Sequence, residues 1–251
     1  MPKLQTTSRR SFKVHEHHLM SIEAVIFDWG GTLTQWHDID FHAESLALAQ
    51  AVRGASDHEH VVNAQLLHEA GSVVWGRSRD HQQSATVEDL FDVAGLEHDP
   101  AMLTAYKDFW APHTLTDPQV RPLFEALRSH GIKVGVLSNT IWPRDWHREF
   151  FERDGVLDLI DGDVYTSEIP FTKPAPEAFR AAMAAVGVSD PTRCVYVGDR
   201  LFEDVWGPHQ LGMKAILIPH SDIPVEQRGH TDGDPDAVAH RLLDVLEVLQ
   251  W

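Results

Sequence analysis

Cysteine is almost absent from this sequence, which has Cys194 as its single thiol in 251 residues. One thiol forms neither an internal disulfide nor a cysteine-rich metal site, and this usage favours a reducing, cytoplasmic location. Long apolar runs are also lacking, because even the run at residues 215–218 is far too short to cross a bilayer. The basic residues near the start precede no apolar stretch, so they do not have the pattern of a secretory signal peptide.

Basic residues are scarce as well. Lys and Arg total 21 against 38 Asp and Glu, which gives a formal net charge of −17. Such a charge argues against nucleic acid or an anionic membrane as the main partner. It leaves room for a phosphorylated small molecule, because a local cationic pocket can hold a phosphate on an acidic protein. Hydrophobic residues at 43% and charged residues at 24% are ordinary globular values, which exclude a mainly disordered, collagen-like or coiled-coil chain.

Strand and helix patterns alternate over most of the chain. The apolar runs at residues 22–27, 132–137, 193–197 and 214–218 have the character of buried parallel strands. Helical patterns follow Asp117-Pro118, cover residues 176–186, and begin again at Asp234-Pro235. This alternation predicts an α/β fold, a three-layer core in which helices cover both faces of a parallel sheet.

One long segment differs from the rest. Residues 38–113 are rich in Ala, Leu, His and Glu, with little strand signal. Four helical patterns fit there, the first marked by Leu46 and Ala49, the second by Val62, Leu66 and Leu67, and the last beginning with Asp99 as cap. A segment of about 75 residues is too long for a loop, so we expect a small helical cap domain.

The expected domains follow from these patterns. Residues 1–19 have no periodicity and are expected to lack fixed structure, with Met20 as the native start. Residues 20–36 and 115–251 are expected to form the α/β core, and residues 37–114 the helical cap.

Polar residues end three of the predicted strands. Asp28 follows the first, Ser138-Asn139 the second and Asp199 the third, while Lys173 stands in a proline-flanked segment before a helix. Ligands bind at the carboxyl ends of strands in parallel α/β sheets. Paired carboxylates can hold a hard divalent cation, a lysine can neutralise phosphate oxygens, and an aspartate can attack phosphorus. The pattern therefore indicates metal-assisted phosphoryl transfer.

In order and spacing these segments resemble the motifs of the haloacid dehalogenase superfamily of hydrolases, over about residues 22–219. The four matching segments are Asp28-Trp29-Gly30-Gly31-Thr32, Val136-Leu137-Ser138-Asn139, Lys173-Pro174-Ala175-Pro176, and Gly198-Asp199 with Asp204. The resemblance implies the superfamily's α/β (Rossmann-like) core, with a helical cap after the first motif.

The resemblance also implies roles. Asp28 would be the nucleophile and a magnesium ligand, together with the backbone carbonyl of Gly30 and the carboxylate of Asp199. Asp204 would support that metal site, and Lys173 would pair with Asp28 and the phosphate. The residues that would bind the transferring phosphate are Ser138, Asn139 and Thr32.

One departure from the family pattern concerns the acid/base. The aspartate normally found two residues after the nucleophile is replaced by Gly30, which offers a carbonyl but no proton. Proton transfer of this kind is worth about 10²–10⁴ in rate. The enzyme would then use substrates with good leaving groups, or a cap group such as His37, Asp38 or Asp40, or it would have lost efficient catalysis.

We therefore expect a Mg²⁺-dependent hydrolase of a small phosphorylated metabolite that acts through an aspartyl-phosphate on Asp28. The alternative from another class is a catalytically weak protein that binds a phosphorylated ligand or a protein partner. A phosphonate hydrolase of this superfamily would use a cap lysine, for which Lys107 is the candidate. A 2-haloacid dehalogenase would lack the metal-binding pair that Asp199 and Asp204 resemble. The sequence carries no signal of oligomeric state.

Overall fold

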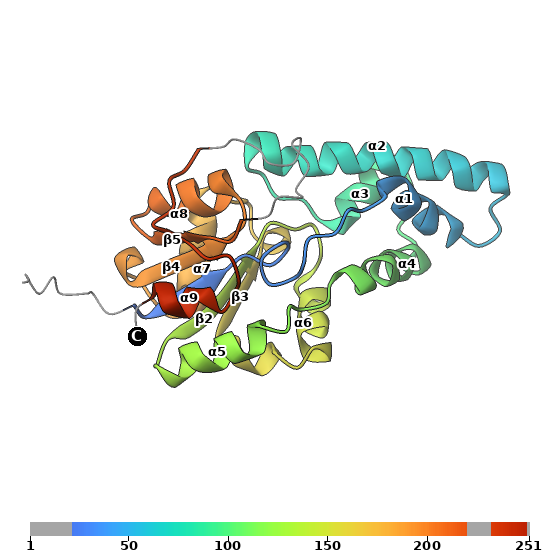
Figure 1. Cartoon of the computed structure of the whole chain (residues 1–251). Coiled ribbons are helices and arrows are strands. Elements are labelled where there is room, and N and C mark those ends of the chain that lie inside the picture. The colour runs from blue at the N-terminus through green and yellow to red at the C-terminus, as the bar shows by residue number, and fades with distance from the viewer. Residues whose placement is uncertain (1–21, 220–231, 250–251) are drawn as a thin grey trace, which may run out of the picture.

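The computed structural model describes residues 22–219 and 232–249 (Figure 1). The expectations for residues 1–19 and for a start at Met20 lie outside these ranges. A six-stranded, wholly parallel sheet forms the centre, in the order β3-β2-β1-β4-β5-β6. The strands are β1 (Ala24–Phe27), β2 (Lys133–Ser138), β3 (Gly162–Tyr165), β4 (Cys194–Gly198), β5 (Lys214–Leu217) and β6 (Ala237–Val238).

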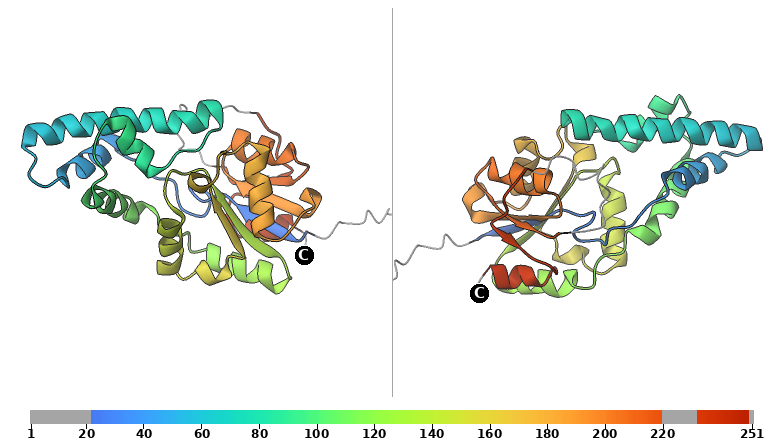
Figure 2. Two further views of the ribbon diagram at one scale, coloured as in Figure 1. Left: turned by 180° about the vertical axis from the view of Figure 1, so that it is seen from behind. Right: turned by 45° about the horizontal axis from the view of Figure 1, so that its top comes forward.

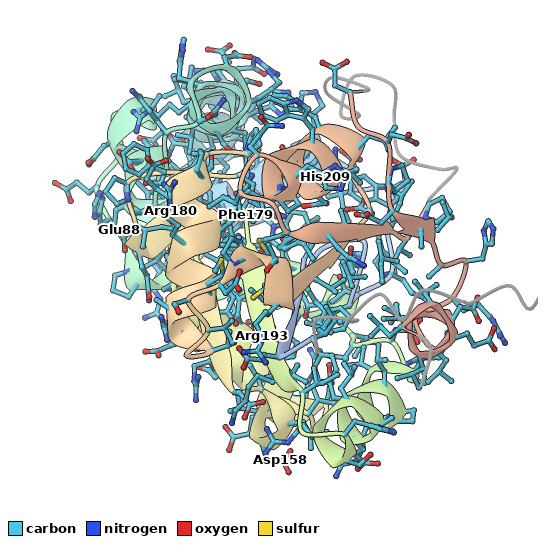
Figure 3. The ribbon with its side chains drawn as sticks, turned by 90° about the vertical axis from the view of Figure 1, so that its left-hand side faces the viewer. Glu88, Asp158, Phe179, Arg180, Arg193 and His209 are labelled. Atoms are coloured by element: carbon cyan, nitrogen blue, oxygen red, sulfur yellow. The ribbon has the colours of Figure 1, made fainter. Side chains whose placement is uncertain are left out.

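Helices cover both faces of this sheet, which confirms the three-layer α/β prediction. On one face, α5 (Val120–Ser129), α6 (Arg144–Arg153) and α9 (Asp244–Val248) share an apolar cluster with Val25 and Phe27 of β1. On the other face, α7 (Pro176–Ala185) packs against Ala24 and Ile26, and Phe179 of α7 is labelled in Figure 3. Successive side chains of a strand point to opposite faces, so the buried run of β1 supplies both clusters.

The segment after β1 forms four helices, as the sequence predicts. They are α1 (Phe41–Gln50), α2 (Asp57–His81), α3 (Val87–Ala94) and α4 (Pro100–Trp110), and they gather beyond the end at which the chain leaves β1 (Figures 1 and 2). Asp99 caps α4 as expected, because its carboxylate accepts the backbone N–H of Ala101 at 2.7 Å. We refer to α1–α4 as the helical insertion. No helix in the described ranges is long and apolar enough to cross a membrane.

The first two insertion helices bury only some of the residues that mark their sequence patterns. Ala49 and Leu67 are buried, whereas Leu46, Val62 and Leu66 are 37%, 43% and 37% exposed. The other side chains that α1 and α2 bury include Leu48, Ala70 and Val74. Both helices carry apolar residues around much of their circumference, so the face that meets a neighbour is decided by how α1, α2 and α3 pack.

Two elements near the sheet edges also differ from expectation. No strand was expected at β3, which pairs with β2 at the edge of the sheet and includes Gly162 and Asp163. The helix expected from Asp234-Pro235 was wrong at its start, because residues 237–238 form β6 and α9 begins only at Asp244. Ala237 and Val238 pair with β5 and satisfy backbone groups that an open edge would leave unpaired.

Candidate active site

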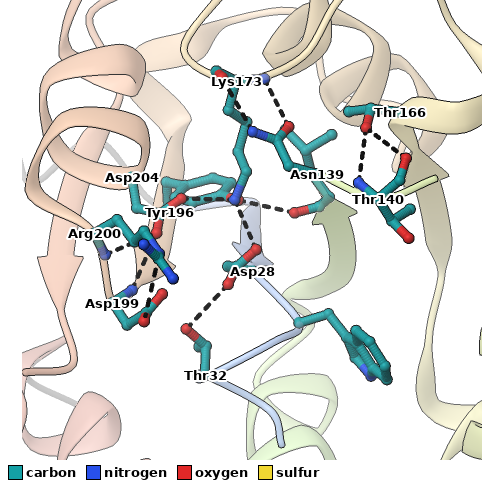
Figure 4. A network of polar contacts seen from close by, with 12 residues as sticks. Asp28, Thr32, Asn139, Thr140, Thr166, Lys173, Tyr196, Asp199, Arg200 and Asp204 are labelled. Atoms are coloured by element: carbon teal, nitrogen blue, oxygen red, sulfur yellow. Dashed lines mark hydrogen bonds and ion pairs between the residues drawn. The ribbon is translucent and has the colours of Figure 1, made fainter. Parts of the chain in front are cut away.

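The polar strand ends predicted from the sequence meet at one edge of the sheet (Figure 4). β1 pairs with β2 on one side and with β4 on the other, in parallel register. Asp28, Ser138 and Asp199 therefore end or follow three adjacent strands. They are only 6%, 3% and 7% exposed, so the site has little contact with bulk water.

Lys173 is the centre of the charge network. Its Nζ donates to Asp28 Oδ1 at 2.6 Å and to Asp204 Oδ1 at 2.7 Å, and the side chain is 1% exposed. Burial alone would lower the pKa of Lys173, but the carboxylates of Asp204 and Asp28 outweigh it and hold the pKa well above its usual value. The lysine is therefore a fixed positive charge against both carboxylates.

Asn139 holds the loop that carries Lys173. Its side-chain amide donates to the Lys173 carbonyl at 3.0 Å, and its Oδ1 accepts the Lys173 backbone N–H at 2.8 Å. Both ends of the amide therefore position the lysine loop, and phosphate binding by Asn139 stays a prediction. Thr32 donates to Asp28 Oδ2 at 3.5 Å, which places its hydroxyl beside the carboxylate. Ser138 lies at the end of β2, next to β1.

Asp204 returns to the site on a short π-helical turn, Leu201–Trp206. Its Oδ2 accepts the backbone N–H groups of Asp199 at 3.1 Å and Arg200 at 2.9 Å, while its Oδ1 accepts Lys173. The carboxylate packs directly over Gly198, where an added Cβ would lie 2.3 Å from the Asp204 Cγ. Asp204 thus braces the loop and the lysine, with both oxygens engaged.

Asp199, in contrast, has two buried carboxylate oxygens with no hydrogen-bond partner in the described part of the chain. The turn at Gly31 approaches it closely, since φ there is +85° and a Cβ would lie 2.7 Å from Asp199 Oδ2. Burial, with the charges of Asp28 and Asp204, raises the pKa of Asp199 well above its usual value. Burial also raises the pKa of Asp28, with Lys173 opposing it.

We predict that Asp199→Asn stabilises the metal-free protein. A carboxyl whose folded pKa is raised contributes stability below its unfolded value of 3.8 and loses it as the pH rises through the folded value. Above pH 3.8 the raised pKa of Asp199 is therefore a cost to folding, and the uncharged amide removes that cost. The gain is about 1–2 kcal/mol, or about 2–8 °C in melting temperature.

Thermal unfolding at pH 7 in EDTA measures this gain. Asp38→Asn is the matched control, because it makes the same chemical change at an exposed carboxylate. A melting temperature at or below that of the unsubstituted protein would contradict the prediction.

The carboxylate cluster fits a hard divalent cation. Ligand oxygens of Asp28, Asp199 and Asp204 lie within 4.8 Å of one another. Among the described residues Asp199 has two oxygens without hydrogen-bond donors, and Asp28 Oδ2 makes a long contact with Thr32 at 3.5 Å. Carboxylate oxygens are the ligands that Mg²⁺ prefers, and a cation there would offset the charge that burial makes costly.

Gly30 lies at the exposed end of the first-motif turn. A Cβ built there would meet nothing within 4 Å, so the position at which an acid/base side chain was expected from the sequence is open. The residues proposed to replace that side chain have other partners or lie in the open. Asp40 caps α1, His37 packs against His113 at 5.1 Å between ring centres, and Asp38 is exposed.

Lys107, the candidate for phosphonate chemistry, is also placed elsewhere. Its Nζ pairs with Glu149 of α6 and lies 6.0 Å from the ring centres of Trp146 and Phe150. This contact joins α4 to α6, so Lys107 links the helical insertion to the core.

Two charged residues near the cluster were not foreseen. Arg200 Nε lies 4.0 Å from Asp199 Oδ2, and its guanidinium packs over the Trp36 ring at 5.4 Å. Burial raises the pKa of Glu203 to about 7, against the opposing charge of Lys173. Arg200 and Glu203 lie between Asp199 and Asp204 in the sequence. The π-helical turn at Leu201–Trp206 brings this segment beside Asp28.

Comparison with known proteins adds independent findings. A family model described as haloacid dehalogenase-like hydrolase matches residues 22–212. The chain is 26% identical to a glyceraldehyde 3-phosphate phosphatase of Methanopyrus kandleri, over 91% of this chain and 97% of that protein. The structure of a haloacid dehalogenase-type (HAD) phosphatase from Thermococcus onnurineus superposes on this chain with a TM-score of 0.63 at 24% identity, over 91% of this chain and 98% of that one.

A dehalogenase shares the fold nearly as well. The L-2-haloacid dehalogenase of Xanthobacter autotrophicus gives a TM-score of 0.59 at 17% identity, over 91% of this chain and 98% of that one. At these identities the structural likeness establishes a common fold. The reaction has to be argued from the site.

Proposed function

The chain belongs to the haloacid dehalogenase-like hydrolases, and from that premise we propose that it is a phosphatase of small phosphorylated metabolites. Three-carbon sugar phosphates are the first substrates to test, because the Methanopyrus kandleri relative is named for glyceraldehyde 3-phosphate. The observation that carries the proposal is the buried triad in which Lys173 bridges Asp28 and Asp204, with Asp199 beside it.

The first chemical step forms a bond between Asp28 and phosphorus. Asp28 Oδ2 is the oxygen that Lys173 leaves available, and it attacks the phosphorus of the bound ester. The bond from phosphorus to the ester oxygen breaks, and the leaving oxygen keeps the electron pair and takes a proton from solvent. Lys173 holds Asp28 in place and, with Ser138, faces the phosphate oxygens.

The second step releases phosphate. Water attacks the phosphorus of the aspartyl-phosphate, the bond to Asp28 breaks, and the carboxylate is restored with inorganic phosphate as product. Gly30 supplies no base for this water, so we expect this step to limit turnover.

A divalent cation is part of the proposal. Asp28 and Asp199, with the Gly30 carbonyl as the family pattern implies, would hold Mg²⁺, and Asp204 would brace them. When bound, the cation supplies positive charge that offsets the phosphate oxygens. The helical insertion, which lies within the cap predicted at residues 37–114, would limit access of water and large substrates to the site.

A rapid time course with an aryl phosphate and Mg²⁺ tests the proposal. We expect a burst of about one equivalent of leaving group per enzyme, then slow turnover, because formation of the aspartyl-phosphate outpaces its hydrolysis. EDTA should abolish both phases. Halide release from a 2-haloacid that persists in EDTA would instead support dehalogenation.

The open space at Gly30 favours a second candidate, a catalytically weak protein that binds a phosphorylated ligand or a protein partner. Tight binding of phosphate esters without burst or turnover, over a panel that includes glyceraldehyde 3-phosphate, would support it against the phosphatase.

A further inference from the structure

The helical insertion is paired with the loop that carries Lys173. Directly after α2, the Ser84 backbone N–H donates to the Pro170 carbonyl at 3.3 Å, and the Thr172 N–H donates to the Gln82 carbonyl at 3.1 Å. Gln83 lies opposite Phe171 in this antiparallel bridge. We call residues 82–84 with 170–172 the lysine bridge, because it ends one residue before Lys173.

The backbone at Gln82 is unusual in a way that serves this bridge. Gln82 has φ 53° and is the only non-glycine residue with positive φ in the described ranges. Such a conformation costs a residue with a Cβ about 1–2 kcal/mol. It ends α2 and turns the Gln82 carbonyl toward Thr172, so the strain is offset by a contact with the core.

Lys173 is therefore fixed from two sides. Asn139 holds its backbone N–H and carbonyl from the end of β2. Gln82 holds the preceding residue, Thr172, from the helical insertion, and Thr172 is only 2% exposed. Moving residues 82–84 would displace Thr172 and, through it, the ammonium on Asp28. A shift of about 1 Å in such a group can cost about 100-fold in rate.

The bridge is also a second attachment of the insertion, remote from the first. The first is an aromatic and ionic seam toward α6, where Trp110 packs on Trp142 at 5.1 Å between ring centres and Lys107 pairs with Glu149. The seam lies beside α6 and the bridge lies in the loop before α7, and these two helices pack on opposite faces of the sheet. An insertion that swung on its two linkers alone would have to break the bridge.

We propose that residues 82–84 position the catalytic lysine and stay paired with its loop throughout turnover. The helical insertion then stays in contact with the core beside Lys173. Substrates enter the site without separation of residues 82–84 from the Lys173 loop. The inference rests on the role proposed for Lys173. It assigns the helical insertion two roles, alignment of Lys173 and control of substrate access to the site.

A reversible crosslink tests it. Gln83 and Phe171 form a non-hydrogen-bonded antiparallel pair, whose Cα atoms lie about 4.5 Å apart, within the range of a disulfide. Gln83 is exposed and Phe171 is 42% exposed, so both can be replaced with little loss of packing. The single native thiol, Cys194, is buried and leaves the engineered pair to form alone.

We expect the oxidised Gln83→Cys/Phe171→Cys protein to hydrolyse an aryl phosphate with kcat/KM within about threefold of its reduced form. A loss of about tenfold or more that dithiothreitol reverses would overturn the inference, because it would show that the bridge must open. The reduced form reports on the proposed function separately: if neither it nor the unsubstituted protein releases phosphate, the phosphatase assignment fails.

A single substitution tests the positioning role. Ser84→Pro removes the N–H that donates to Pro170, and we expect kcat to fall about tenfold with KM within about twofold. Gln83→Ala is the matched control, because it removes an exposed side chain and keeps the backbone pairing. An unchanged kcat in folded Ser84→Pro, or a rise in KM alone, would contradict the role.

Discussion

Asp28→Asn is expected to abolish the burst and to lower phosphate release by about 10⁴-fold or more. The amide has the shape of the carboxylate and can still accept the Lys173 ammonium, whose present contact is 2.6 Å. It has no anionic oxygen with which to attack phosphorus, so no aspartyl-phosphate can form. The loss should appear in kcat as well as in kcat/KM, for good and poor leaving groups alike.

This loss should come without loss of stability. Burial raises the pKa of Asp28, so the folded protein holds its charge at a cost and the neutral amide relieves it. Stopped-flow leaving-group release and thermal unfolding of the same sample measure the two effects. Asp38→Asn, at an exposed carboxylate, should leave the burst intact. Phosphate release by Asp28→Asn within about tenfold of the unsubstituted rate would disprove the nucleophile assignment.

Gly30→Asp is expected to raise steady-state turnover by about 10²-fold, toward the range typical of general acid–base catalysis. The substitution is sterically open, because a Cβ at Gly30 meets nothing within 4 Å. A carboxyl there can protonate the leaving oxygen and then accept a proton from the attacking water. Hydrolysis of the aspartyl-phosphate would accelerate and cease to limit turnover, so the burst should disappear.

Gly30→Asn separates the effect of proton transfer from the effect of placing a side chain in the open space at Gly30. It has nearly the same size as the aspartate but cannot take up the proton of the attacking water. The test compares single-turnover dephosphorylation rates of Gly30→Asp, Gly30→Asn and the unsubstituted protein. If Gly30→Asp and Gly30→Asn dephosphorylate at the same rate, the missing acid/base does not limit the turnover of this protein.

The adjacent glycine should not tolerate the same change. Gly31 has φ +85°, and its Cβ would lie 2.7 Å from Asp199 Oδ2. The sequence pattern places Gly30, and not Gly31, at the acid/base position, but only the structure shows that the first position is open and the second is pressed against a carboxylate.

The sequence predicted the core strands well because their signal is local. The apolar runs that became β1, β2, β4 and β5 are buried on both faces, and such runs need no knowledge of their neighbours to be recognised. β3 was not predicted because it lies at an edge of the sheet, where pairing with one strand supports a sequence that includes Gly162 and Asp163. β6 was not predicted because its two residues are too few to show a strand pattern.

The site shows the same division. The order Asp28, Ser138, Lys173, Asp199 indicated which residues meet, since parallel strands place their carboxyl ends at one edge. It did not indicate that Asn139 clamps the Lys173 backbone, or that Asp204 engages both oxygens in bracing the loop. A side chain that can bind phosphate can equally hold a backbone, and the choice depends on what lies within hydrogen-bond reach.

The sequence by itself determined the family and the chemical groups of the candidate site, because these depend on which residues end the strands and in what order. The tertiary structure decided how those groups are held. The lysine bridge joins residues 82–84 to residues 170–172, and no local pattern in either segment indicates the other. Hydrogen bonds between segments so far apart in the chain exist only once α2 has packed over the core, so the alignment of Lys173 is a property of the folded molecule.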